Sequence, residues 1–379
     1  MTKCRIGIKA HTLSGAAALI IAVFLTLLFT GCPNAHGNKL ATPKYQVTFS
    51  VDGAGGTLKA KADGETEINS GDKVEHGKTV TFTATPAAGY RVKGWTLDDN
   101  VVNGTAETYT LAVTQSATIT VSFEPKKALL TLEAGKNTVK VKAKTADGKP
   151  ITVEGCTVNE LANEAETTLT VTDSERKLAL IGDIIELDCR GEETTGGNRP
   201  LIALDVSGCT ALQKLNCQYN KIAELDVSGL TALQELDCNT NQLKTLNVKG
   251  LTALQELSCS SNQLTELNVQ GLIKLQQLYC SNNQLTALNV QSCTALKKLE
   301  CFQNKLNADA FTKLFNDLPA REVSDKAKAL LYVDRAGVTE ENCTNFSTPE
   351  SLKKAFENAR DVKHWKMQKA NYFGFGEDI

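Results

Sequence analysis

One spacing dominates this sequence: between residues 206 and 310 the same pattern returns every 21 residues without a gap. A short unit of this kind cannot bury its own apolar face, so we expect neighbouring units to stack around one continuous core. A degenerate copy precedes them. Its apolar positions are Ile184, Leu187 and Cys189, and the five regular units begin at Val206, Val227, Val248, Val269 and Val290.

Within each unit the frame reads L-x-x-L-x-C-x-x-N-x-L-x-x-L-x-V. Because side chains alternate along a strand, Leu236 and Cys238 should point inward while Glu235 and Asp237 point outward. The asparagine of the frame should bond backbone groups that the following turn leaves unpaired. This ladder consists of Asn220, Asn241, Asn262, Asn283 and Asn304.

This frame is the leucine-rich-repeat pattern, and the L-x-V-x-G second half resembles the treponemal subclass of leucine-rich repeats. The resemblance covers residues 189–306 and implies a solenoid whose short parallel strands line a concave face. It also implies a surface or exported protein of bacteria.

The cysteines at the third apolar position should form a stack of buried thiols that act as small hydrophobic side chains. Neighbouring rungs, about 4.8 Å apart, are within disulfide range, but their parallel orientation gives a poor dihedral angle. A linear ladder does not converge on a zinc ion. The ladder comprises Cys217, Cys238, Cys259, Cys280 and Cys301, and the sequence leaves open whether Cys156 and Cys343 form any disulfide.

The first 31 residues have the features of an export signal. A basic stretch precedes an apolar run, Ala16 to Phe29, which is shorter than the roughly 20 residues of a membrane-spanning helix. The run ends in Leu-Phe-Thr-Gly-Cys, which resembles the lipobox of bacterial lipoproteins with Phe29 where leucine is usual. The resemblance implies cleavage before Cys32, lipidation of that cysteine, and a tether over residues 32–44; the alternative is a plain secretory signal cleaved near Gly31.

Residues 45–126 alternate apolar and polar side chains between glycine-rich turns and predict an all-β module. The segments VTFTATP, GYRVKGW and TITVSFE resemble the B-repeat of internalins, a resemblance that implies a stalk or spacer.

The repeats should be closed at both ends, because an uncapped end would expose the core to water. Residues 127–188 predict a β cap, and residues 307–379 predict a small α/β cap. Helices are expected over residues 307–319 and from about 349 to 360, the second opened by a capping box, with strands at 330–333 and near the C-terminus. The fold class is therefore mainly β, with a small α/β C-terminal cap.

The sequence predicts no enzyme, no cofactor and no metal site. His36, His76 and His364 lie in three separate segments, and no catalytic motif is present. The net charge is −2 for the full sequence, and about −5 without residues 1–31, so nucleic acid is not an expected partner. A small-molecule substrate is not expected either.

The outward strand positions form the candidate protein-binding surface, because the concave face is the common recognition face of solenoids. Aromatic residues among polar neighbours are frequent interface hot spots. The acidic middle of the face should favour a partner with basic groups. The candidate residues are Lys214, Asn216, Gln218, Tyr219, Glu235, Asp237, Asn239, Glu256, Ser258, Gln277, Tyr279, Lys298, Glu300 and Phe302.

Three functional hypotheses remain. The first is a lipoprotein, held in the membrane by its lipid anchor on the outer-membrane surface, that attaches to proteins of a host or of neighbouring cells; the two resemblances imply it. The second is a scaffold on the periplasmic side that binds another envelope protein. The third is an enzyme, which no motif supports.

Overall fold

The computed structural model describes residues 41–87, 89–194, 196–334, 337–371 and 376–379. The expected signal segment, Cys32 and most of the tether lie outside these residues. Among the residues that are described, no helix has both the length and the apolar character needed to span a membrane.

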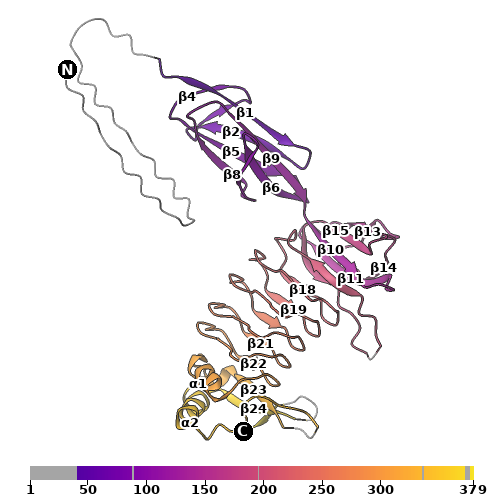
Figure 1. Cartoon of the computed structure of the whole chain (residues 1–379), viewed down its shortest axis with the longest axis vertical. Helices are drawn as coiled ribbons and strands as arrows, with labels where there is room; N and C mark the ends of the chain where they lie inside the picture. Colours follow the sequence, from indigo (N-terminus) through magenta and orange to yellow (C-terminus); the bar gives the residue numbers. More distant parts are fainter. Residues whose placement is uncertain (1–40, 88, 195, 335–336, 372–375) are drawn as a thin grey trace, which may run out of the picture. The chain divides into compact units, whose positions relative to one another are not determined.

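The N-terminal module consists of two β-sheets around a core of its own, as the alternating pattern predicts (Figure 1). Trp95 is 1% exposed in this core, and its indole nitrogen donates a hydrogen bond to the carbonyl of Ala106. Position 56 requires glycine, because a Cβ atom there would lie 2.4 Å from the Phe123 ring. One sheet has the order β4-β1-β9-β6-β7, with β4 Lys73–Glu75, β1 Lys44–Asp52, β9 Ala117–Pro125, β6 Tyr90–Leu97 and β7 Asn100–Asn103. The other sheet has the order β3-β2-β5-β8, with β3 Thr66–Ile68, β2 Gly56–Ala62, β5 Thr79–Pro86 and β8 Thr108–Ala112.

The segment before the repeats is also built of strands, divided between two sheets. A five-stranded sheet has the order β13-β12-β15-β10-β17, with β13 Glu160–Leu161, β12 Ile151–Glu154, β15 Lys177–Ile181, β10 Lys127–Leu132 and β17 Leu201–Asp205. Strands β14 (Thr167–Thr170) and β11 (Thr138–Thr145) instead begin an eleven-stranded sheet that continues through the repeats. The expected boundary at residue 188 does not separate the two sheets, because β17 lies beyond it and β16 (Ile184–Asp188) joins the longer sheet.

Each repeat contributes one three-residue strand to the eleven-stranded sheet. The strands are parallel and in register, so that Leu236 pairs with Leu215 on one side and Leu257 on the other. The central leucine of each strand is at most 1% exposed, as the alternation predicts. These strands are β18 Lys214–Asn216, β19 Glu235–Asp237, β20 Glu256–Ser258, β21 Gln277–Tyr279 and β22 Lys298–Glu300.

The asparagine ladder links consecutive units through their backbones. The Asn241 side chain donates hydrogen bonds to the carbonyls of Cys217 (3.0 Å) and Cys238 (3.1 Å) and accepts one from the Ile222 amide (3.0 Å). The same three bonds recur in the other units, which confirms the predicted role of this position. The repeated residues are Asn220, Asn262, Asn283 and Asn304.

The C-terminal segment extends the same sheet with three strands and packs two helices beside it. Helix α1 (Ala308–Asp317) is capped by Asn307, which accepts a hydrogen bond from the Ala310 amide. The elements that follow are η1 Val323–Asp325, β23 Lys328–Val333, α2 Glu350–Glu357, η2 Asn358–Val362, β24 Lys366–Ala370 and β25 Gly376–Asp378.

The capping box expected at the start of α2 is wrong. Pro349 occupies the N-cap position, and no side chain caps the helix. The Ser347 hydroxyl instead donates a hydrogen bond to Asn345.

The cysteine ladder is buried, and its thiols are unpaired. Cys189 of the degenerate unit adds a rung to the five of the regular units. Burial raises the pKa of Cys259 to about 12, and it also raises the pKa of Cys238 well above its ordinary value. Because the thiolate is the nucleophile and the metal ligand, these buried thiols are inert at neutral pH.

The substitution Leu257→Ala removes a side chain with no exposed surface from the middle of the core. We expect it to lower the free energy of unfolding by about 2–5 kcal/mol, because burial is lost and a cavity remains. Chemical denaturation of the two proteins measures this difference, with the exposed Ile273→Ala as the matched control. A loss below that of the control would contradict a continuous core.

Candidate functional site

The outward side chains of β18–β22 form the surface that we call the strand face. Glu235 and Asp237 flank the buried Leu236 and point away from the core, and the other units repeat this arrangement. Of the fourteen candidate residues, all but Ser258 are partly or fully exposed.

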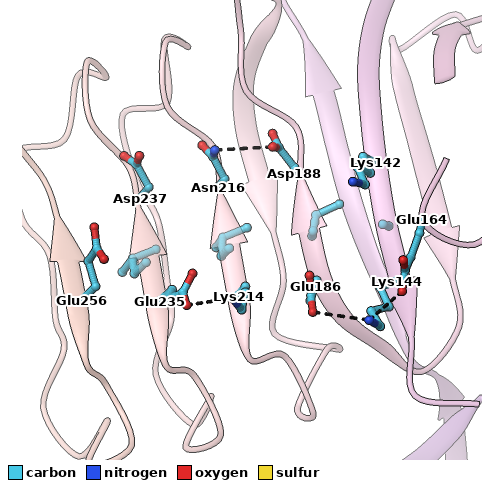
Figure 2. A pocket seen from close by; sticks show the side chains of 14 residues that line it. Lys142, Lys144, Glu164, Glu186, Asp188, Lys214, Asn216, Glu235, Asp237 and Glu256 are labelled. Carbon is cyan, nitrogen blue, oxygen red and sulfur yellow. Dashed lines mark hydrogen bonds and ion pairs between the residues drawn. The ribbon is translucent and has the colours of Figure 1, made fainter. Parts of the chain in front are cut away.

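A hollow of about 330 Å³ lies at the N-terminal end of the strand face. Figure 2 shows its lining side chains rising from β11 and from successive strands of the repeats. It brings together five predicted residues, namely Lys214, Asn216, Glu235, Asp237 and Glu256.

The hollow also contains side chains that the candidate set lacks. Lys142 and Lys144 come from β11, a strand assigned to the flanking segment, and Glu164 follows β13. Glu186 and Asp188 come from β16 of the degenerate unit. The outward alternation of the degenerate unit predicts the direction of the last two, whereas the pairing of β11 with β16 has no signal in the sequence.

Most of the charged side chains on the β11 side of the hollow form ion pairs with each other. Lys144 lies 2.6 Å from Glu164 and 3.9 Å from Glu186. The Lys214 amine lies 2.8 Å from Glu235 on the next strand (Figure 2). These pairs are partly exposed, so each stabilises the fold only slightly.

Asp188 is paired as well. Its carboxylate lies 3.1 Å from Arg190 and accepts a hydrogen bond from the Asn216 side chain. Burial raises the pKa of Asp188, and the nearby Arg190 opposes this shift.

Asp237 and Glu256 differ from these carboxylates. Within the described ranges, neither has a basic side-chain nitrogen within 4.0 Å. Asp237 accepts a hydrogen bond from the Asn239 amide, and Glu256 accepts one from the Gln277 side chain. Burial raises the pKa of both groups; the charge of Glu256 adds to the shift of Asp237, and the charge of Glu235 to that of Glu256.

On the strands that follow Glu256, the strand face carries an aromatic ring and a lysine. The Tyr279 hydroxyl donates a hydrogen bond to Gln277 (2.6 Å), and the Lys298 amine lies 4.4 Å from the centre of the Tyr279 ring. Lys298 is also paired with Glu300 at 3.1 Å. The ring is therefore held in one orientation before any partner arrives.

Tyr219 lies beside the strand face rather than within it. It follows β18 in a left-handed backbone conformation, and the Arg199 guanidinium lies 5.6 Å from its ring centre. Gln218, Asn239 and Phe302 are half-buried positions after their strands and do not line the hollow.

Ser258 takes an outward strand position but is only 5% exposed. Its strand neighbours in register are Asp237 and Tyr279, both of which have larger side chains.

In the described part of the chain, no group of three or more histidine, cysteine or acidic side chains could hold a metal ion. The arrangement on the strand face suits hydrogen bonding and charge pairing with another molecule.

Comparisons with known proteins identify two parts of the chain. Residues 54–127 match the family described as "Divergent InlB B-repeat domain", and residues 210–251 match "Leucine Rich repeats (2 copies)". The resemblances to leucine-rich repeats and to the internalin B-repeat are thereby confirmed at the level of these two families. Families of these two kinds are typically non-enzymatic binding or surface proteins.

Two solved structures are similar to part of the chain. The functional domain of InlJ from Listeria monocytogenes, described as including a cysteine ladder, is 41% identical over 32% of this chain and 26% of its own, with a TM-score of 0.30. A leucine-rich-repeat protein of Leptospira interrogans is 28% identical over 34% of this chain and 34% of its own, with a TM-score of 0.27. The match thus spans only about a quarter to a third of these proteins. The comparison with curated proteins gave no match.

The substitution Asp237→Asn should raise the midpoint of thermal unfolding at neutral pH. The folded-state pKa of Asp237 is raised, so its ionisation above that pKa opposes folding, and the amide removes this cost while its oxygen can still accept the Asn239 hydrogen bond. Below the unfolded-state pKa both states are protonated, and the difference between variant and parent should vanish.

The control for this prediction is Asp226→Asn. Hydrogen bonds from Ser228 lower the pKa of Asp226, so its charge favours folding at neutral pH, and its loss should lower the midpoint. Calorimetry across a pH series measures both variants, and equal shifts in the same direction would contradict the electrostatic account.

Proposed function

We propose that this protein is an exported lipoprotein, anchored through Cys32, that binds other proteins through the strand face of its repeats in an adhesin-like role. The partner is a surface or extracellular protein of a host or a neighbouring cell. The observation that carries this proposal is the strand face itself, which combines a hollow, a fixed aromatic ring and two carboxylates without a basic partner among the described residues.

The domain organisation that suits this role has six parts. A signal peptide spans residues 1–31, a tether 32–44, a B-repeat-like spacer 45–126, an N-terminal cap 127–188, a treponemal-type solenoid 189–306 and a C-terminal cap 307–379. In this arrangement the strand face is the concave face of the solenoid. The continuation of the repeat sheet into strands on both sides supports the cap assignment.

The family matches support binding rather than catalysis. Leucine-rich-repeat proteins generally bind protein partners, and the B-repeat family is typical of surface proteins. A periplasmic scaffold that binds another envelope protein is the alternative, because the same strand face would serve it equally well.

Replacing Tyr219 and Tyr279 together by alanine should reduce attachment of protein-coated beads to target cells. Aromatic residues on such a face contribute strongly to binding, and we expect a loss of about tenfold or more in attached beads. The matched control is Ile202→Ala with Ile273→Ala, which removes two exposed apolar side chains from other surfaces. Equal attachment by all three proteins, with unfolding midpoints unchanged, would contradict the assignment of the strand face.

Brief protease treatment of intact cells separates the two locations. If the protein is digested while a periplasmic control protein survives, the adhesin-like role stands. If it is digested only after the envelope is broken, the scaffold role replaces it.

A further inference from the structure

We propose that two copies of this chain associate through their strand faces, related by a two-fold axis that runs along β21. This inference rests on the proposed function, because it names a second copy, on a neighbouring cell, as a partner of the same face. The argument comes from the order of the strands, the distribution of charge on either side of β21, and charged side chains that have no partner of opposite charge.

The outward side chains on one side of β21 are mostly acidic. Strands β16, β18, β19 and β20 precede β21 in the eleven-stranded sheet. The hollow on these strands and β11 is lined by six carboxylates and three lysines, a net charge of −3. Figure 2 shows Glu186, Glu235 and Glu256 on three of the strands. We call this side of the sheet the acidic half.

The outward side chains on the other side of β21 are mostly basic. Lys298, Lys328 and Lys366 stand in register on β22, β23 and β24. Ala329 and Met367 belong to the core, so the lysines beside them project to the same face as the outward residues of the repeats. A second hollow, of about 790 Å³, has three lysines, one histidine and no carboxylate among its described lining residues. We call this side of the sheet the basic half.

Charged side chains in both halves remain without a partner of opposite charge. Among the described residues, Glu256 has no basic nitrogen within 4.0 Å, and Lys328 has no acidic oxygen within the same distance. Lys328 also stands between two other lysines, and like charges directly opposite each other destabilise a sheet. An opposite charge supplied from outside the chain would stabilise both positions.

A second copy supplies these charges in the required order. A two-fold axis along β21 reverses the order of the strands but not their direction, so β20 of one copy faces β22 of the other, and β19 faces β23. Glu256 then meets the second copy's Lys298, and Glu235 meets its Lys328. Symmetry repeats both contacts, which makes four. Sheets that stack face to face lie about 10 Å apart, a gap that facing glutamate and lysine side chains can span.

The centre of this interface is aromatic. Tyr279 lies on β21, so the axis brings it opposite the second copy's Tyr279. Aromatic residues near the centre of an interface often contribute much of the binding energy. The Lys298 amine donates to the Tyr279 hydroxyl (3.1 Å) and pairs with Glu300 (3.1 Å), and an ammonium group has a third N–H that can donate to Glu256.

The outermost facing positions carry like charges that are already compensated. The axis brings Lys214 of β18 opposite the second copy's Lys366 of β24. Lys214 lies 2.8 Å from Glu235, and Lys366 lies 3.0 Å from Asp378 of its own chain. Because each lysine has a carboxylate beside it and salt screens exposed charges, this pair opposes association only weakly.

A second copy fits the face better than a partner of uniform charge. A partner with only basic groups would be attracted to the acidic half and repelled by the basic half, and a partner with only acidic groups would meet the reverse. The face requires a partner whose charge changes sign at its middle. Another copy of the same face has this property.

The experiment measures the oligomeric state of the purified chain by sedimentation velocity, up to about 0.1 mM because a small polar interface binds weakly. We expect a reversible dimer. Glu235→Lys with Glu256→Lys should weaken association about tenfold or more, and so should Lys298→Glu with Lys328→Glu, because all four contacts then join like charges. An equal mixture of these two variants should form a heterodimer at least as tight as the parent dimer, because every contact again joins opposite charges.

The matched control is Glu224→Lys with Glu266→Lys, which makes the same change of charge at two exposed positions outside the strand face. It should change association by less than about twofold. A parent that stays monomeric over the whole range would overturn the proposal, as would equal weakening in the control or a mixture of the two reversed variants that does not associate. Oligomers larger than a dimer would also overturn it, since acidic and basic halves that meet without two-fold closure continue into chains.

The oligomeric state and the proposed function are tested separately. A monomeric parent whose beads still attach to target cells through Tyr279 would overturn this inference and leave the proposed function standing. A dimer with the expected response to charge reversal, in a protein that protease reaches only after the envelope is broken, would leave the dimer standing and reject the adhesin-like role.

Discussion

The repeats depend on one hydrogen-bonding arrangement, the asparagine that joins the backbones of two consecutive units. The buried backbone around each three-residue strand needs hydrogen-bond partners, because buried backbone groups without partners would destabilise the fold. The asparagine donates to two carbonyls and accepts from one amide, as in Asn241. Asn342 makes the same three bonds, to the carbonyls of Cys301 and Leu331 and from the Leu306 amide. The sheet therefore continues past the last regular unit because the backbone there is satisfied in the same way.

Much of this could be predicted from the sequence, since a pattern repeated five times averages out local exceptions. The direction of each strand side chain, the burial of the leucines and cysteines, and the Asn307-capped helix follow from periodicity and local chemistry. Asn342 could not be found this way, because Leu331 replaces the cysteine and a long helical insertion separates it from Asn304. Only the lining residues from the repeats could be predicted, because Lys142 and Lys144 reach the hollow through the antiparallel pairing of β11 with β16.

The strand face and the core are governed by different forces. The leucine and cysteine ladders lower the free energy of the folded state by removing apolar surface from water. On the opposite side of the same strands, Asp237 and Glu256 are held partly buried and close to other negative charges, which raises their pKa values and opposes folding. A core of this regularity tolerates such an opposing contribution at a few outward positions. Surfaces that bind partners are often less stable than they could be for this reason.

The constant 21-residue spacing of the asparagine ladder, from Asn220 to Asn304, has a consequence for the evolution of the gene. Unequal recombination between two copies of the corresponding DNA adds or removes whole units. Every ladder asparagine in the new protein then has the same kinds of backbone partner as before. The outward residues of a gained or lost unit change the length of the strand face, while the lysines of β11 stay at the hollow. A change in gene length alone can thus lengthen or shorten this surface while the packing and hydrogen bonding of each unit stay the same.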